Sequence, residues 1–75
     1  RWYRLAAEQG LSDACTKLGE LYFNGDGVGR DLVEAWVWFD RAAEGGDFLG
    51  KAWRARVEKQ LSAQELERAR QRTGG

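Results

Sequence analysis

The amino-acid sequence repeats itself at an interval of 36 residues. The segment at residues 2–10, Trp-Tyr-x-x-Ala-Ala-Glu-x-Gly, recurs at residues 38–46 as Trp-Phe-x-x-Ala-Ala-Glu-x-Gly. An interval in the thirties is typical of solenoids whose unit is a pair of helices. Each such unit buries its apolar side only against its neighbours, so this repetition restricts the chain to a stack of helices.

The spacing of apolar residues agrees with this restriction. No stretch alternates between apolar and polar residues, as a half-buried strand would. Helical spacing instead predicts five helices. The first runs from Arg1 to about Glu8, the second follows Ser12 and the third follows Asp31. The fourth runs from about Phe48 to Gln60, and the fifth begins at about residue 63.

Residues that cap helices mark the predicted starts. Ser12 is placed to be the N-cap of the second helix. Asp31 and Glu34 have the spacing of a capping box, and so do Ser62 and Glu65. These pairs predict helices beginning after residues 31 and 62.

Two glycine patterns predict special backbone geometry. Gly19 lies in the middle of the second helix, where it costs about 1 kcal/mol relative to Ala. We therefore expect a neighbouring helix to approach closely there. The segment at residues 24–30, Asn-Gly-Asp-Gly-Val-Gly-Arg, predicts a loop, in which the glycines permit positive φ angles at Gly25-Asp26-Gly27.

A longer pattern connects these features to a known family. It reads Leu18-Gly19-x-x-Tyr22-x-x-Gly25-x-Gly27-Val28-x-x-Asp31-x-x-x-Ala35-x-x-Trp38-x-x-x-Ala42-Ala43-x-x-Gly46. Over residues 1–50 the sequence resembles the Sel-one-like repeat, a relative of the tetratricopeptide repeat. The resemblance implies an all-α fold, a right-handed α/α superhelix with about five helices in antiparallel pairs.

The resemblance also divides the chain into three parts. Residues 1–10 would be the second helix of a truncated upstream repeat, residues 11–46 one complete repeat, and residues 47–75 a C-terminal capping pair of helices. The chain begins without Met, which favours the C-terminal part of a longer array.

The fourth helix departs from the repeat pattern. The positions 36 residues beyond Leu18 and Tyr22 are occupied by Arg54 and Glu58. A repeat would place apolar residues there, so we expect this helix to end the array.

Charge is balanced over the whole chain but not along it. Twelve basic and twelve acidic residues give a formal net charge of zero, which excludes a whole-chain attraction to nucleic acid or anionic membrane. Residues 1–50 carry five basic and nine acidic side chains, and residues 51–75 carry seven and three. The cluster of basic residues comprises Arg54, Arg56, Lys59, Arg68, Arg70 and Arg72. It predicts salt bridges with nearby glutamates or, as the alternative, a surface for nucleic acid or another acidic partner.

The sequence offers little for catalysis. It has no His, and the single residue Cys15 has no base to activate it, so a small buried filler is the favoured role. Gly25-x-Gly27-x-Gly29 follows a predicted helix and has Arg30 where a dinucleotide loop has its third glycine. A calcium loop starting at residue 24 would lack its closing Glu. We therefore expect no enzyme, cofactor, metal or small-molecule substrate, and no apolar run is long enough to predict a membrane span.

The resemblance implies a protein–protein interaction scaffold that binds a protein or peptide on its concave face. By similarity to the tetratricopeptide groove, the partner-facing residues would be Asp13, Thr16, Glu20, Phe23 and Asn24. Self-association through Trp2, Tyr3 and Leu5 is a second expectation, because these residues would pack on an upstream helix. The partner and the compartment stay open.

Overall fold

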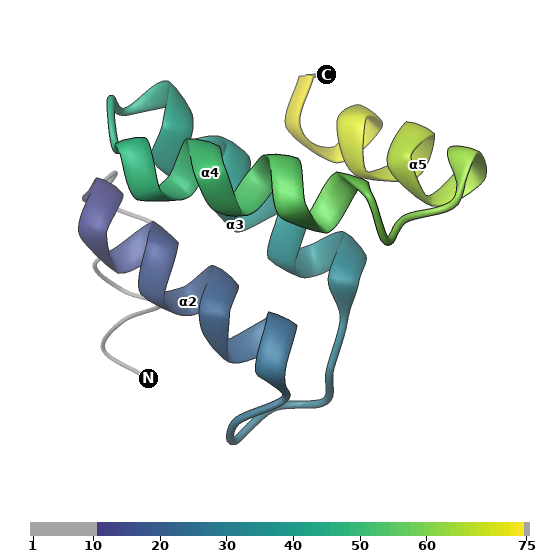
Figure 1. The fold of residues 1–75 in the computed structure, drawn as a ribbon, viewed down its shortest axis with the longest axis horizontal. Helices are drawn as coiled ribbons and strands as arrows, with labels where there is room; N and C mark the ends of the chain where they lie inside the picture. Colours follow the sequence, from purple (N-terminus) through teal and green to yellow (C-terminus); the bar gives the residue numbers. More distant parts are fainter. Residues whose placement is uncertain (1–10, 75) are drawn as a thin grey trace.

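The computed structural model describes residues 11–74 of the chain. Four helices lie in this part: α2 (Ser12–Asn24), α3 (Leu32–Glu44), α4 (Phe48–Glu58) and α5 (Ala63–Gly74). Successive helices reverse their direction (Figure 1). The described residues contain no strand, which confirms the all-helical prediction.

The predicted number of about five helices differs from the four helices in residues 11–74. The helix expected between Arg1 and Glu8 lies outside the described residues. So does the self-association surface of Trp2, Tyr3 and Leu5.

Helix α3 forms the centre of the molecule. It is buried on several sides because α2, α4 and α5 all pack against it. Its buried residues are Val33, Ala35, Trp36, Val37, Trp38, Phe39 and Ala42. Trp38 and Ala42 form a cluster with Ala14, Cys15 and Leu18 of α2. The other buried residues of α3 belong to a second cluster with Val57 and Ala69.

Capping at α3 and α5 follows the sequence prediction, with one difference. The backbone N–H of Glu65 donates to Ser62 Oγ at 3.1 Å, and the N–H of Ser62 donates to Glu65 Oε1 at 2.9 Å. This is the complete capping box that the sequence predicted. At α3 the N–H of Glu34 donates to Asp31 Oδ1 at 3.1 Å. The Glu34 carboxylate instead contacts Trp38 Nε1 and Arg72.

The prediction that Ser12 is the N-cap of the second helix is wrong. Leu11 is the N-cap, its side chain makes no capping bond, and Ser12 is already the first helical residue. The Leu11 carbonyl accepts from the N–H of Cys15 at 3.1 Å. Ser12 Oγ lies against Gly45, where a Cβ would collide with it. Ser12 thus packs against the end of α3 and does not cap its own helix.

The glycine predictions are confirmed. Gly25 ends α2 with a φ of 77°, and its N–H donates to the Leu21 carbonyl at 2.7 Å. Gly27 has a φ of 76°. A Cβ on Gly19 would lie 2.6 Å from Cε1 of the fully buried Phe39, so α2 and α3 approach closely at this point.

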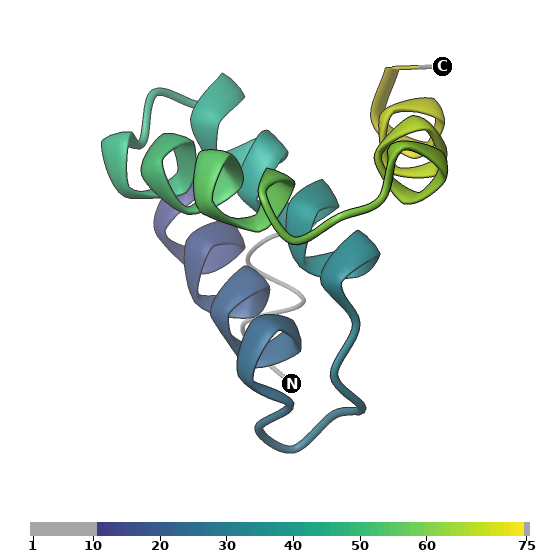
Figure 2. The same ribbon diagram turned by 45° about the vertical axis from the view of Figure 1, so that its right-hand side comes forward.

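Helix α5 packs on α3 and barely contacts α4, the helix that precedes it (Figure 2). Ala69 is fully buried in the second cluster, and Leu66 packs against it. Arg72 Nη1 forms an ion pair with Glu34 Oε1 at 2.5 Å. One side of α4 is consequently left uncovered in the described part of the chain.

Candidate functional site

Two equivalent helices form one face of the molecule. Helices α2 and α4 begin 36 residues apart, at the interval of the sequence repeat. In Figure 1, α4 passes in front of α3 and lies above α2. The partner-facing positions predicted on α2 therefore have counterparts on α4. Asp13 corresponds to Leu49, Thr16 to Ala52 and Glu20 to Arg56.

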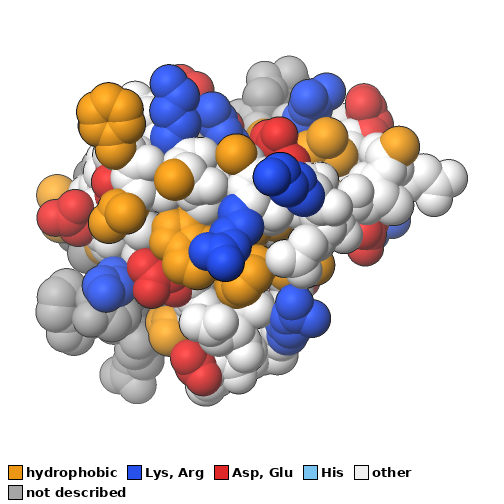
Figure 3. All heavy atoms as spheres, in the orientation of Figure 1, with side chains coloured by type: hydrophobic (Ala, Val, Ile, Leu, Met, Phe, Trp, Pro, Cys, Tyr) orange, Lys and Arg blue, Asp and Glu red, His pale blue; other side chains and the backbone are white. Residues whose placement is uncertain are grey.

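A shallow hollow of about 210 Å³ lies on this face, lined by Leu49, Ala52, Trp53 and Arg56. Leu49 is 62% exposed, so its side chain presents apolar surface to the solvent. Hydrophobic atoms gather between α2 and α4 in Figure 3, with Lys and Arg atoms lying over them. The hollow is apolar on its floor and cationic at its edge.

The floor of the hollow is held rigidly by three aromatic rings. The ring of Trp53 stacks on Phe39 of α3 with centroids 5.3 Å apart and an interplanar angle of 7°. Phe23 of α2 meets Trp53 edge-on at 5.1 Å and 63°. Both arrangements are favoured by the charge distribution of aromatic rings. Trp53 therefore connects three helices while it still lines the hollow.

Two arginines lie over these rings. Arg30 Cζ is 5.7 Å from the centroid of Phe23, and Arg30 Nε donates to the Phe23 carbonyl at 2.9 Å. Arg56 Cζ is 5.4 Å from the centroid of Trp53. Both distances are within the range of cation–π attraction. Neither arginine is in an ion pair with another residue of the described range 11–74.

The structure separates the five predicted partner-facing residues into two groups. Asp13 and Asn24 are exposed, and Glu20 is partly exposed. Thr16 is only 3% exposed, and its hydroxyl donates to Asp47 Oδ2 at 2.6 Å, which connects α2 to the start of α4. Phe23 is partly buried beside Trp53. Thr16 is thus not accessible to a partner.

Sequence reasoning missed the contribution of α4 to this face. Leu49, Ala52 and Arg56 lie 36 residues beyond predicted positions on α2, so the repeat interval held the necessary signal. Because Arg54 and Glu58 depart from the repeat pattern, the face predicted from the sequence was not extended to α4. Those two residues face α3, and the solvent side of α4 is a separate surface.

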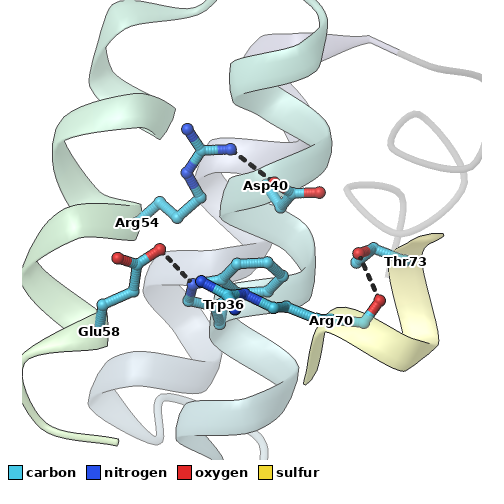
Figure 4. A network of polar contacts seen from close by, with 6 residues as sticks. All are labelled: Trp36, Asp40, Arg54, Glu58, Arg70 and Thr73. Carbon is cyan, nitrogen blue, oxygen red and sulfur yellow. Dashed lines mark hydrogen bonds and ion pairs between the residues drawn. The ribbon is translucent and has the colours of Figure 1, made fainter. Parts of the chain in front are cut away.

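The basic cluster of the C-terminal helices is divided by the fold. Arg54 forms an ion pair with Asp40 at 2.5 Å, and Glu58 Oε2 accepts from Trp36 Nε1 at 2.9 Å, so both join α4 to α3 (Figure 4). Arg70 reaches from α5 toward Trp36 in the same view. Because α4 and α5 barely touch, and Arg54 and Arg72 are in ion pairs, no observation favours one continuous nucleic-acid surface.

The Cys15 side chain has the environment of a packed residue rather than of a nucleophile. It is 2% exposed, and burial raises the pKa of its thiol, an effect that the nearby Arg41 opposes. The thiol is therefore protonated and inert near neutral pH. Within residues 11–74 no three potential ligands among Cys, Asp and Glu gather to hold a metal ion. None of the described helices is long and apolar enough to cross a membrane.

Comparison with known proteins identifies the fold. The sequence matches the Sel1 repeat family at residues 1–11 and 12–47. A crystal structure of a protective antigen present in uropathogenic Escherichia coli strains, displaying an SLR fold, is 49% identical in sequence. It superimposes with a TM-score of 0.89 over 91% of this chain and 15% of that one.

A second similar protein is the chitin synthase regulator SKT5 of Malassezia restricta, 50% identical over 46 residues. This match covers 61% of the present chain and 3% of the relative. The chain therefore spans a small part of the length of both proteins. The family match covers more than half of the chain, and the helical architecture agrees with the solved structure. The chain belongs to the Sel1 repeat family.

Proposed function

We propose that this chain is a non-catalytic scaffold module that binds a protein or peptide segment on the concave face formed by α2 and α4. Sel1 repeats act in general as scaffolds for protein interactions, which supports the proposal at the level of the family. The observation that carries it for this chain is the apolar hollow beside α2, whose lining residue Leu49 is left open to solvent.

The residues of the face would make three kinds of contribution: polar contacts, apolar contacts and support from below. Asp13, Glu20 and Asn24 are placed to offer polar contacts along α2. Leu49 and Ala52 offer apolar contact area on α4. Thr16 and Phe23 would hold α2 against α4, since Thr16 bonds to Asp47 at the start of α4 and Phe23 contacts Trp53 of α4. We propose this scaffold function ahead of nucleic-acid binding because two of the six clustered basic residues are in ion pairs.

The proposal can be tested by selecting phage-displayed random peptides on the full chain. We expect selected peptides to bind the native chain and to lose binding to Ala52→Trp, because the indole would fill the hollow. Ala63→Trp is the matched control, since Ala63 is also exposed but lies at the start of α5. The proposal fails if no peptide is enriched, or if the enriched peptides bind Ala52→Trp as well as they bind the native chain.

A further inference from the structure

We infer that Arg30 and Arg56 make this face selective for an acidic peptide segment, one in which carboxylates flank an apolar side chain. The inference rests on the proposed function and specifies the chemistry of the partner. It is carried by the guanidinium groups of Arg30 and Arg56, which lie over Phe23 and Trp53 and form no ion pair within residues 11–74. It is also carried by the apolar hollow that Arg56 lines together with Leu49, Ala52 and Trp53.

The aromatic rings hold the two arginines by cation–π attraction, without an opposite charge. Phe23 and Trp53 meet edge-on, and each ring carries one of the two arginines, Arg30 over Phe23 and Arg56 over Trp53. Contact with a ring occupies the face of a guanidinium and leaves its N–H groups available at the edge. Arg30 uses Nε for the Phe23 carbonyl and retains its two terminal nitrogens. Such planar donors can bind a carboxylate in a bidentate manner, as they can a phosphate.

The charges around the hollow assign an orientation to the partner. All the exposed charged residues of α4 are basic: Lys51 and Arg56, followed by Lys59 just past the helix end. Glu58 is the acidic residue of α4, and its carboxylate is engaged by Trp36. On α2, by contrast, Asp13 and Glu20 would repel acidic groups. The carboxylates of the partner should therefore lie along α4 and near Arg30.

The hollow adds a requirement that a simple polyanion does not meet. Its lining from Leu49, Ala52 and Trp53 is apolar, and its volume of about 210 Å³ is of the order of one large side chain. A partner that places only charge on this face would leave the apolar lining in water. An acidic segment with one Leu or Phe satisfies both the arginines and the hollow.

Defined synthetic peptides provide the test. Fluorescence anisotropy would measure binding of the full chain to a peptide with Leu flanked by Glu residues. Two sister peptides would replace the Glu residues by Gln or the Leu by Ser. We expect each sister peptide to bind at least about tenfold more weakly. We also expect Arg30→Gln combined with Arg56→Gln to lose at least about tenfold for the acidic peptide, while the control Arg68→Gln binds normally. Arg68 is exposed on α5 and carries the same charge.

Several results would overturn the inference. One is equal binding of the Glu and Gln peptides. Another is an equal loss of affinity in Arg68→Gln, because that would show attraction to overall charge. A third is single-stranded DNA that binds in an Arg56-dependent manner and displaces the peptide. If these peptides fail while other peptides are enriched in the random selection, the inference fails and the proposed function stands. If nothing is enriched, both fail.

Discussion

Replacing Gly50 by Ala tests the packing of α4 on α3, because helix propensity and packing predict opposite results. Gly50 is a buried residue of α4. A Cβ at this position would lie 2.5 Å from Ala42 Cβ, and 3.1 Å from both the Ala43 nitrogen and the Phe39 carbonyl oxygen. These are backbone atoms of α3 and the first side-chain carbon of a fully buried residue, so no flexible group can move aside.

The two effects have similar sizes, and their difference sets the expected result. Ala in place of Gly within a helix stabilises by about 1 kcal/mol. An extra carbon forced into a well-packed contact costs about 1–3 kcal/mol. We expect the upper part of that range, because α4 as a whole must shift away from α3. The free energy of unfolding of Gly50→Ala should therefore fall by about 1–2 kcal/mol, which lowers the melting temperature by roughly 5–15 °C in a domain of this size.

Urea and thermal unfolding followed by circular dichroism would measure this change. Gly29→Ala is the control, since no atom lies within 4 Å of a Cβ there, and its stability should change by less than about 1 kcal/mol. Adding Ala42→Gly to Gly50→Ala removes the shortest contact, so the double-mutant cycle should show a coupling of at least about 0.5 kcal/mol. The packing argument is refuted if Gly50→Ala is as stable as the native chain or more stable.

Three further predictions concern single groups. Glu58→Ala leaves the buried Nε1–H of Trp36 without its 2.9 Å partner, and urea unfolding should show a loss of about 1–3 kcal/mol; no loss would mean that water replaces the carboxylate. Asp31→Ala removes the N-cap of α3 and should cost about 1 kcal/mol, whereas Asp31→Asn should retain most of the stability. Burial raises the pKa of the Cys15 thiol above its ordinary value, so the unfolded thiol loses its proton first as pH rises. The Cys15 contribution to stability is complete below the pKa of the unfolded thiol and is lost as pH rises through the folded pKa. In urea unfolding at increasing pH, Cys15→Ala should reduce the slope with which the free energy of unfolding falls. An unchanged slope would contradict the assignment.

The sequence was most informative where a feature depends on residues close together in the chain. The capping pair Ser62 and Glu65 formed as predicted, because both hydrogen bonds lie within one turn of helix. Gly25 could end α2 as predicted, because this requires only a positive φ at Gly25 and a hydrogen bond to the carbonyl four residues earlier. The position of Gly19 in the middle of a helix also correctly indicated the close approach of a neighbouring helix.

Features that depend on distant partners could not be derived in the same way. Ser12 has the residue type and position of an N-cap, but the end of α3 at Gly45 fixes its location. Thr16 has the spacing of an exposed groove residue, yet Asp47 engages its hydroxyl from 31 positions away. The ion pair of Arg72 with Glu34, which accompanies the docking of α5 on α3, could not be anticipated either, because the sequence assigned Glu34 to a capping box.

Trp36 and its neighbours explain why α4 can depart from the repeat pattern and still pack in the repeat position. The side of α3 that faces α2 carries Trp38 and Ala42, which recur in the repeat and pack against α2. The Nε1–H of Trp38 finds its partner within α3, in Glu34. The side that faces α4 carries Trp36 and Asp40, each with a polar group that needs a partner when buried. Arg54 and Glu58 provide those partners at the positions where a repeat would place Leu and Tyr. A helix with Leu and Tyr at these positions would leave the Asp40 carboxylate and the Trp36 N–H unpaired against it. Such polar pairs add little net stability, but they penalise the wrong neighbour. The two sides of α3 thus discriminate between helices that share one backbone position, and the exposed side of α4 remains free to differ from α2.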